Sequence, residues 1–134
     1  TVSNALGAST MSDAFAATKD TVAPTIVSVV AATGATTGTV TFSEAVHGGT
    51  AAVPAALVFG NFVYNNVNAL GATALVAPVT TTGVTVSTAT VTFSAATIAS
   101  DFTAGTPDTL AAAAGAIFDA AGNAMGVGAV GLTH

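Results

Sequence analysis

The chain has 134 residues, a length that fits one domain with a short extension, and it carries six acidic residues against one basic residue, Lys19. The net charge of −5 excludes a nucleic-acid partner, because phosphate-binding surfaces need lysine and arginine. No run approaches the roughly 18 apolar residues of a membrane span. The absence of cysteine excludes disulfides and thiolate metal sites, and it fits a cytosolic or a prokaryotic extracellular protein.

Charged residues are unusually scarce. They make up 5% of the chain, whereas 51% is hydrophobic, chiefly alanine and valine; a soluble domain usually has about a quarter of its residues charged. Such a surface suits permanent contact with copies of the same chain, or hydroxyl-linked glycan. A secreted monomer of unusual composition is the alternative. With no signal peptide recognisable at Thr1, we expect a mature, processed or excised chain, and no Asn-x-Ser/Thr glycosylation site is present.

In chain order, residues 1–19 are expected to form an N-terminal arm and residues 20–134 the folded domain. Met11 and Phe15 have the spacing of one helical turn, although serine and threonine around them disfavour a helix. One interpretation is an arm that docks on a neighbouring copy, for example as an added strand. The other is a frayed or self-packed terminus.

The first strands follow from proline placement and alternation. Pro24 restricts the residue before it and lacks an N–H donor, which predicts the start of an edge strand over 26–32. The central strand is predicted over 38–46, where Val40 and Phe42 alternate with polar residues. The same pattern returns in 84–95, the expected partner of the central strand.

The remaining segments predict further short strands. An aromatic stretch over 57–67 bends at Gly60, and 72–80 contains Pro78, which favours an edge position. A Val- and Gly-rich strand over 125–132 ends the chain. Seven or eight short strands with turns near every ten residues predict an all-β, Greek-key β-sandwich.

One segment is ambiguous. Thr106, Pro107 and the alanines after them resemble a helix start, with threonine as the cap and proline in the first turn. This predicts a short helix near 107–114. The sandwich interpretation instead places a strand near 110–118.

Three segments together resemble a known family: Asp20–Val29, then Val40–Val46, then Asp119–Ala124. Their order and spacing are similar to the bacterial Ig-like domains of S-layer proteins and large surface adhesins. The resemblance implies an Ig-like sandwich that serves as a structural module, and several such domains bind calcium at domain junctions. The Ala-rich region before Asp119 and the first eighteen residues depart from the family pattern.

Calcium is the best-supported ligand. It takes six to eight oxygen ligands from carboxylates, amides and carbonyls, and oxygen-bearing side chains stand at the ends of several predicted strands. The candidate ligands are Asp20, Glu44, Asp101, Asp119 and Asn123. We expect them to converge at one pole of the sandwich. The alternative is that each one caps a turn or solvates a linker.

Catalysis has little support. Ser43, Glu44 and His47 could be drawn as a triad, but all three lie at one strand end, and His47 is expected to be an exposed turn residue. We therefore expect no enzyme. The aromatic stretch 59–64 is expected to pack in the core rather than to form a glycan platform.

The favoured function is a structural subunit of an extracellular, self-assembling prokaryotic surface structure, an S-layer or a filament. Copies would associate through apolar and hydroxyl-rich faces, with calcium and strand exchange contributing. Residues 1–18 are favoured over 127–134 as the exchanged segment. The alternative is an adhesion or ligand-binding module cut from a larger cell-surface protein, with cell-surface glycan as a candidate partner.

Overall fold

The computed structural model describes residues 17–134, so most of the predicted N-terminal arm, including the Met11–Phe15 segment, lies outside the described residues. The described part is all-β, as predicted. Its strands are β2 (Ile26–Val30), β3 (Thr37–Thr50), β4 (Val53–Ala55), β5 (Phe62–Asn65), β6 (Leu75–Thr80), β7 (Val86–Phe93), β8 (Thr109–Ala112), β9 (Phe118–Asp119) and β10 (Val130–Thr133). Two single 3₁₀ turns, η2 (Phe59–Asn61) and η3 (Ala99–Phe102), complete it.

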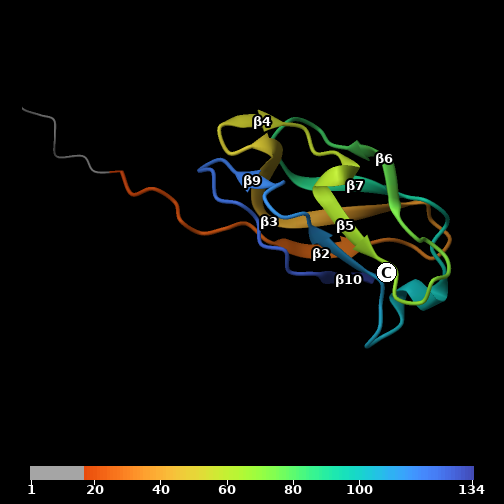
Figure 1. Cartoon of the computed structure of the whole chain (residues 1–134). Helices are drawn as coiled ribbons and strands as arrows, with labels where there is room; N and C mark the ends of the chain where they lie inside the picture. The colour runs from red at the N-terminus through yellow and green to blue at the C-terminus, as the bar shows by residue number, and fades with distance from the viewer. Residues whose placement is uncertain (1–16) are drawn as a thin grey trace, which may run out of the picture.

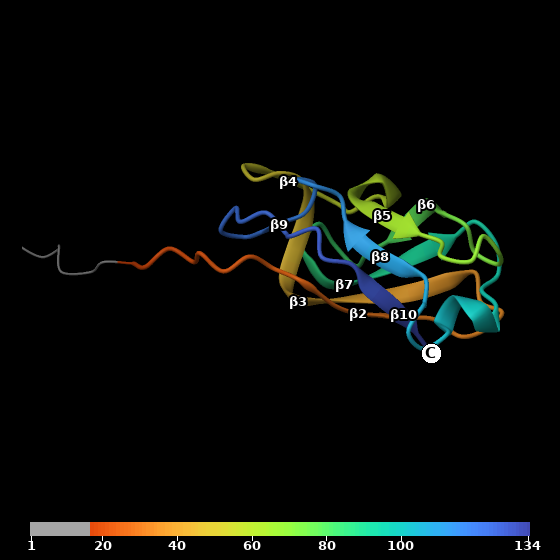
Figure 2. The same ribbon diagram turned by 60° about the horizontal axis from the view of Figure 1, so that its bottom comes forward.

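The strands form one continuous, nearly closed mixed sheet in the order β5-β8-β10-β2-β3-β7-β6. The path folds over itself, so β5 and β8 face β3 and β7 across a core (Figures 1 and 2). The parallel pair β10–β2, with Leu132 beside Val29, joins the two layers. The sheet has nine strands where seven or eight are expected, because two short strands, β4 and β9, pair with the C-terminal half of β3.

The core follows the predicted alternation. Val40 and Phe42 of β3 are 0% and 4% exposed, while Thr39 between them is exposed. The ring of Phe42 stacks on that of Phe62 from the opposite layer, with centroids 6.4 Å apart. The predicted inward placement of the aromatic stretch is therefore confirmed for Phe62, whereas Phe59 is 46% exposed.

The predicted partner of the central strand is also confirmed. β7 runs antiparallel to β3, and the register pairs Thr39 with Thr90 and Thr37 with Thr92. These threonines lie on the outer face, because Val91 and Phe93 between and beside them point into the core. Over the paired stretch from Thr37 to Thr41, the outer face of β3 and β7 is consequently rich in hydroxyl groups and carries no charge.

The helix predicted near 107–114 is wrong. Thr109–Ala112 is the strand β8, which pairs with β5 on one side and β10 on the other. Leu110, Ala111 and Ala112 are all buried. The helix propensity of an alanine run amounts to a few tenths of a kcal/mol per residue, which pairing on two sides and burial on both faces easily exceed.

Two edge predictions have different outcomes. β6 with Pro78 ends the strand path, as predicted. The strand after Pro24 is not an edge, because β2 lies between β10 and β3. Pro24 precedes the first paired residue, Ile26, so its missing N–H costs no ladder hydrogen bond.

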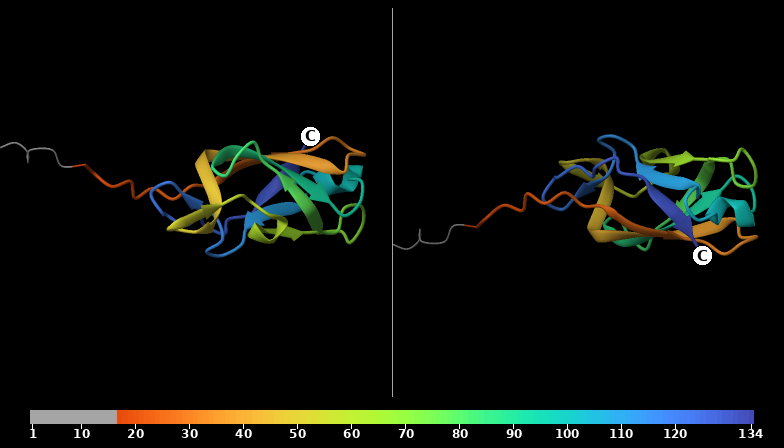
Figure 3. Two further views of the ribbon diagram at one scale, coloured as in Figure 1. Left: turned by 90° about the horizontal axis from the view of Figure 1, so that it is seen from above. Right: turned by 90° about the horizontal axis from the view of Figure 1, so that it is seen from below.

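The two ends of the described chain lie at opposite poles of the sandwich. Residues 17–23, which we call the lead-in, run away from the pole formed by β4 and β9, while the C-terminus lies at the other pole (Figure 3). No helix among residues 17–134 has the length and apolarity needed to cross a membrane.

Candidate metal centre

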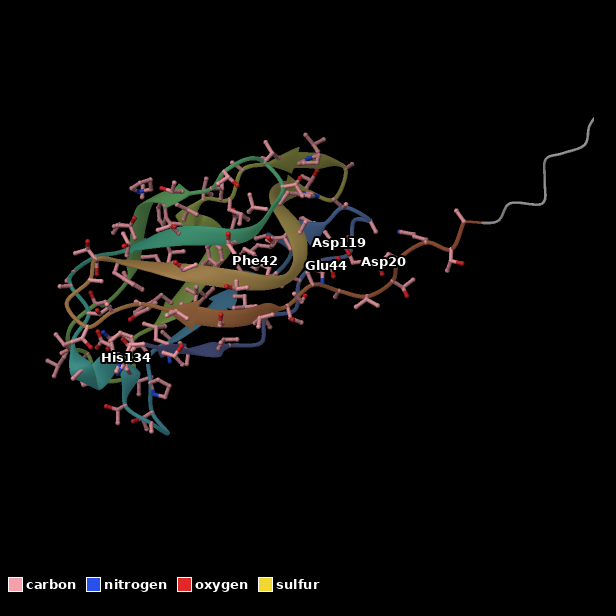
Figure 4. All side chains as sticks on the ribbon, turned by 180° about the vertical axis from the view of Figure 1, so that it is seen from behind. Asp20, Phe42, Glu44, Asp119 and His134 are labelled. Carbon is pink, nitrogen blue, oxygen red and sulfur yellow. The ribbon has the colours of Figure 1, made fainter. Side chains whose placement is uncertain are left out.

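Three of the predicted ligands meet at the pole where the lead-in joins the sandwich. Asp20 comes from the lead-in, Glu44 from β3 and Asp119 from β9, and one carboxylate oxygen from each lies within 4.8 Å of the others. The three side chains converge in Figure 4. The pairing of β9 with the far half of β3, which sets Asp119 beside Val46, brings two of them together.

Asp119 is the fixed member of this acidic triad. It is 1% exposed, and its Oδ1 accepts hydrogen bonds from the N–H groups of Ala121 and Asn123, both at 2.8 Å. Burial by itself raises the pKa of Asp119, but the hydrogen bonds from Asn123, Ala121 and Gly122 outweigh it and lower the pKa. Asp119 therefore caps its turn, as the alternative interpretation holds, and also stays ionised and available to a cation.

Asn123 ties the lead-in to this turn. Its Nδ2 donates to Asp119 Oδ2 at 2.7 Å and also to the backbone carbonyls of Asp20 and Val22, at 3.1 and 3.3 Å. The amide nitrogen of Asn123 thus joins the backbone of the lead-in to the carboxylate of Asp119, and the Oδ1 of the same side chain stays a predicted metal ligand.

Glu44 shows the electrostatic strain of the triad. Desolvation raises its pKa, and the neighbouring carboxylates of Asp119 and Asp20 raise it further. Three carboxylates without a histidine or cysteine form a hard, all-oxygen donor set, which suits Ca²⁺ or Mg²⁺ rather than Zn²⁺ or Cu²⁺. Such a cation would relieve the repulsion that holds the pKa of Glu44 up.

Asp101 does not join the triad. It lies in η3 near the opposite pole and is fully buried, and its Oδ2 accepts hydrogen bonds from the N–H groups of Ile98 (3.0 Å) and Ala72 (3.4 Å). The prediction that it contributes to a common site is therefore not met: Asp101 closes a local turn. Sequence reasoning also missed Asp108, which is fully buried and accepts a 2.6 Å hydrogen bond from the Tyr64 hydroxyl.

His47 is not an exposed turn residue, so that prediction is wrong. It lies in β3, is 2% exposed and stacks on Phe118. Its Nδ1 lies 2.7 Å from the carbonyl oxygen of Gly48, and its Nε2 lies 3.1 Å from that of Asp119. The ring nitrogens thus face backbone carbonyls and make no contact with Ser43, whose hydroxyl accepts the N–H of Thr25.

Comparison of the chain with family models, curated proteins and solved structures finds no match.

Proposed function

We propose that this chain is a structural subunit of an extracellular, self-assembling surface structure, an S-layer or a filament. The observation that carries the proposal is the distribution of charged residues in the fold. No acidic or basic residue other than the buried His47 occurs in residues 45–100, which supply η2 and four complete strands. Asp20, Glu44 and Asp119 gather at one pole, and Asp101 and Asp108 are buried. The sides of the sandwich between its two poles, which we call the flanks, therefore lack the interspersed charges that keep folded domains apart.

The same flanks expose large apolar side chains. Among the described residues these include Val27 (58% exposed), Phe59 (46%), Val63 (53%) and Leu70 (59%). Single exposed hydrophobic residues are ordinary, but an uncharged surface that combines them with rows of threonine favours association between copies. The threonine-bearing outer face of β3 and β7 adds hydroxyl groups that can hydrogen-bond across such a contact.

Calcium at the acidic triad is the finer part of the proposal. Asp20, Glu44 and Asp119 would supply carboxylate oxygens, and water or nearby carbonyls would complete the coordination. Because Asp20 belongs to the lead-in and the other two to the sandwich, a bound Ca²⁺ would fix the direction in which the lead-in leaves the domain. Copies or neighbouring modules joined through the lead-in would then keep a constant orientation.

The alternative function, an adhesion or ligand-binding module of a larger cell-surface protein, has one observation in its favour. Asp20 lies where the chain enters the sandwich, so the triad would stiffen a junction with a preceding module as effectively as a junction with an arm. In that case the isolated chain would remain a monomer with Ca²⁺ bound.

Sedimentation velocity and negative-stain microscopy of the full chain, with Ca²⁺ and with excess chelator, test the proposal. The structural-subunit function predicts particles, sheets or fibres at high protein concentration with Ca²⁺. A 12.7 kDa monomer at every concentration, with or without Ca²⁺, would refute it and leave the module alternative.

A further inference from the structure

The strand path has two ends, β5 and β6. The two end strands approach each other where the sheet is nearly closed, but neither of their outer edges pairs with another strand among the described residues. An unpaired edge offers backbone N–H and C=O groups to any extended segment, and natural proteins usually block it with proline, lysine or a bulge. The two edges of this sheet differ in this respect.

β6 is blocked. Pro78 lies in its middle and lacks an N–H donor, and its register with β7 shifts between Val76 and Thr80. β5 has neither device: Phe62–Asn65 contains no proline or charge, and its register with β8 is continuous from Phe62↔Ala112 to Asn65↔Thr109. β5 therefore carries no such block against a further strand.

The surroundings of β5 also suit an uncharged partner. Val58, Phe59 and Val63 are 54%, 46% and 53% exposed, and Val67 and Leu70 in the following loop are 47% and 59% exposed. No acidic or basic side chain occurs between residues 58 and 70. A strand added here would bury apolar side chains without desolvating a charge.

We propose that residues 1–16 of one copy add as a strand to the β5 edge of the next copy. This inference rests on the proposed self-assembly and names its contact. Asp13 is the one charged side chain of this segment, and residues 1–12 have none, so a donor strand within residues 1–12 matches the uncharged edge. The other segment considered for exchange, 127–134, is already used: Val130–Thr133 is β10, paired with β2 and β8 in its own sheet.

The direction of the lead-in makes the contact one between copies. Residues 17–23 run away from the body at the acidic pole (Figures 1 and 3). Sixteen further extended residues span roughly 50 Å, while a domain of this size is about 35 Å across. That length reaches β5 of a copy placed beyond the pole. Because the donor segment and the acceptor edge are different surfaces, the contact is head-to-tail, and it propagates into an open filament unless the rotation between copies closes a ring.

An adjacent pair of prolines tests the donor. Successive N–H groups of a strand point to opposite sides, so Leu6→Pro combined with Gly7→Pro removes one hydrogen bond to β5 in every register that sets residues 6 and 7 against this strand. The matched control is Ala17→Pro with Thr18→Pro, in the exposed lead-in. By sedimentation, the arm variant is expected to lose the polymer, at least tenfold in polymer mass, and the control to keep it.

Photocrosslinking tests the acceptor. The chain has no cysteine, so Val63→Cys accepts a single photoreactive maleimide, with Val76→Cys on β6 as the control. Lys19 is the sole trypsin site, so an arm crosslinked to an isotopically distinct copy appears as residues 1–19 attached to 20–134. We expect this product from Val63→Cys and not from Val76→Cys.

The outcomes separate the two proposals. Absence of any polymer from the wild-type chain overturns the proposed function. A polymer that survives the paired prolines, or that crosslinks through Val76 rather than Val63, overturns the β5 contact and leaves self-assembly standing.

Discussion

The side-chain amide of Asn123 donates a hydrogen bond to the backbone carbonyl of Asp20, 3.1 Å away and 103 residues earlier in the chain. The same nitrogen holds the carboxylate of Asp119. One amide thus joins the segment that enters the sandwich to the turn near the end of the chain. This link holds Asp20, which belongs to no strand, beside the turn that carries Asp119.

Neutralising Glu44 should have opposite effects with and without calcium. The pKa of Glu44 is raised by desolvation and by Asp119 and Asp20, so its charge opposes folding when no cation is bound, increasingly as the pH rises through that pKa. Glu44→Gln is expected to raise the melting temperature in chelator. In excess Ca²⁺ the wild type should melt higher, because the variant has lost a ligand. Scanning calorimetry in both conditions measures the crossover.

Ionic strength provides the control for this crossover. Screening by added NaCl relieves repulsion among exposed carboxylates but does not need a coordination site. If NaCl at matched ionic strength raises the melting temperature as much as Ca²⁺ does, the triad is a charged surface and not a metal centre.

Trypsin reports on the lead-in. Lys19 is the one residue of the chain at which trypsin cleaves, and it is exposed. The protease must also bind the residues that follow the cleaved bond, so cleavage is slowed while Asn123 holds the carbonyls of Asp20 and Val22. Asn123→Ala removes the amide that holds the carbonyls of Asp20 and Val22. We expect cleavage severalfold faster in this variant and severalfold slower in the wild type with Ca²⁺, followed by mass spectrometry. Equal rates in all three samples would contradict a docked lead-in.

Two glycines with positive φ form a matched pair. Gly34 has φ +88° with open space around it, whereas at Gly71, φ +63°, an added Cβ would lie 2.6 Å from Asp101 Oδ2. Gly34→Ala should cost about 1 kcal/mol, the strain of a left-handed conformation. Gly71→Ala should cost roughly 3 kcal/mol, because the loop must also move off a buried carboxylate. Urea unfolding of both variants measures the difference, and equal losses would refute the close approach at Gly71.

The environment of Tyr64 predicts that the fold loses stability at alkaline pH. Burial raises its pKa, and so do the hydrogen bond to Asp108 and the charge of that carboxylate. The resulting stability is complete below the ordinary tyrosine pKa of about 10 and is lost as the pH rises beyond it. Because the chain has one tyrosine and no tryptophan, tyrosinate absorbance should appear together with loss of the β-sheet circular dichroism signal.

The Tyr64→Phe variant separates this effect from general alkaline unfolding. It should lose about 1–3 kcal/mol at pH 7, because one oxygen of the buried Asp108 carboxylate loses its donor. Its stability should then depend less on pH above 10. An unchanged pH dependence would show that Tyr64 does not carry the effect.

The elements that the sequence predicts correctly are those whose pattern is local. Val40 and Phe42 alternate with threonine, and this period alone identifies β3 and its repeat in β7. The segment Leu110–Ala112, where the alanine run begins, has no such signal. Its strand conformation is decided by β5 and β10, which are distant in sequence.

The residues of the candidate site also differ in how well local sequence patterns predict their positions. Asp119 and Asn123 belong to one recognisable turn, and Glu44 ends a recognisable strand, so their meeting with Asp20 follows from the fold class. Asp101 also follows a predicted strand, but at the other pole, and composition does not distinguish the two poles. His47, next to two glycines, has the local signature of a turn; β3 continues through it because β4 and β9 pair with its far half.

The parallel pairing of β2 with β10 has a mechanical consequence. Val29 lies beside Leu132 and Val30 beside Thr133, and the N–H of Ala31 donates to the carbonyl of Thr133 at 2.9 Å. A pull between the lead-in and the C-terminal end would slide these two strands along each other in shear. Their hydrogen bonds would then share the load instead of opening one at a time, an arrangement suited to a domain that carries tension.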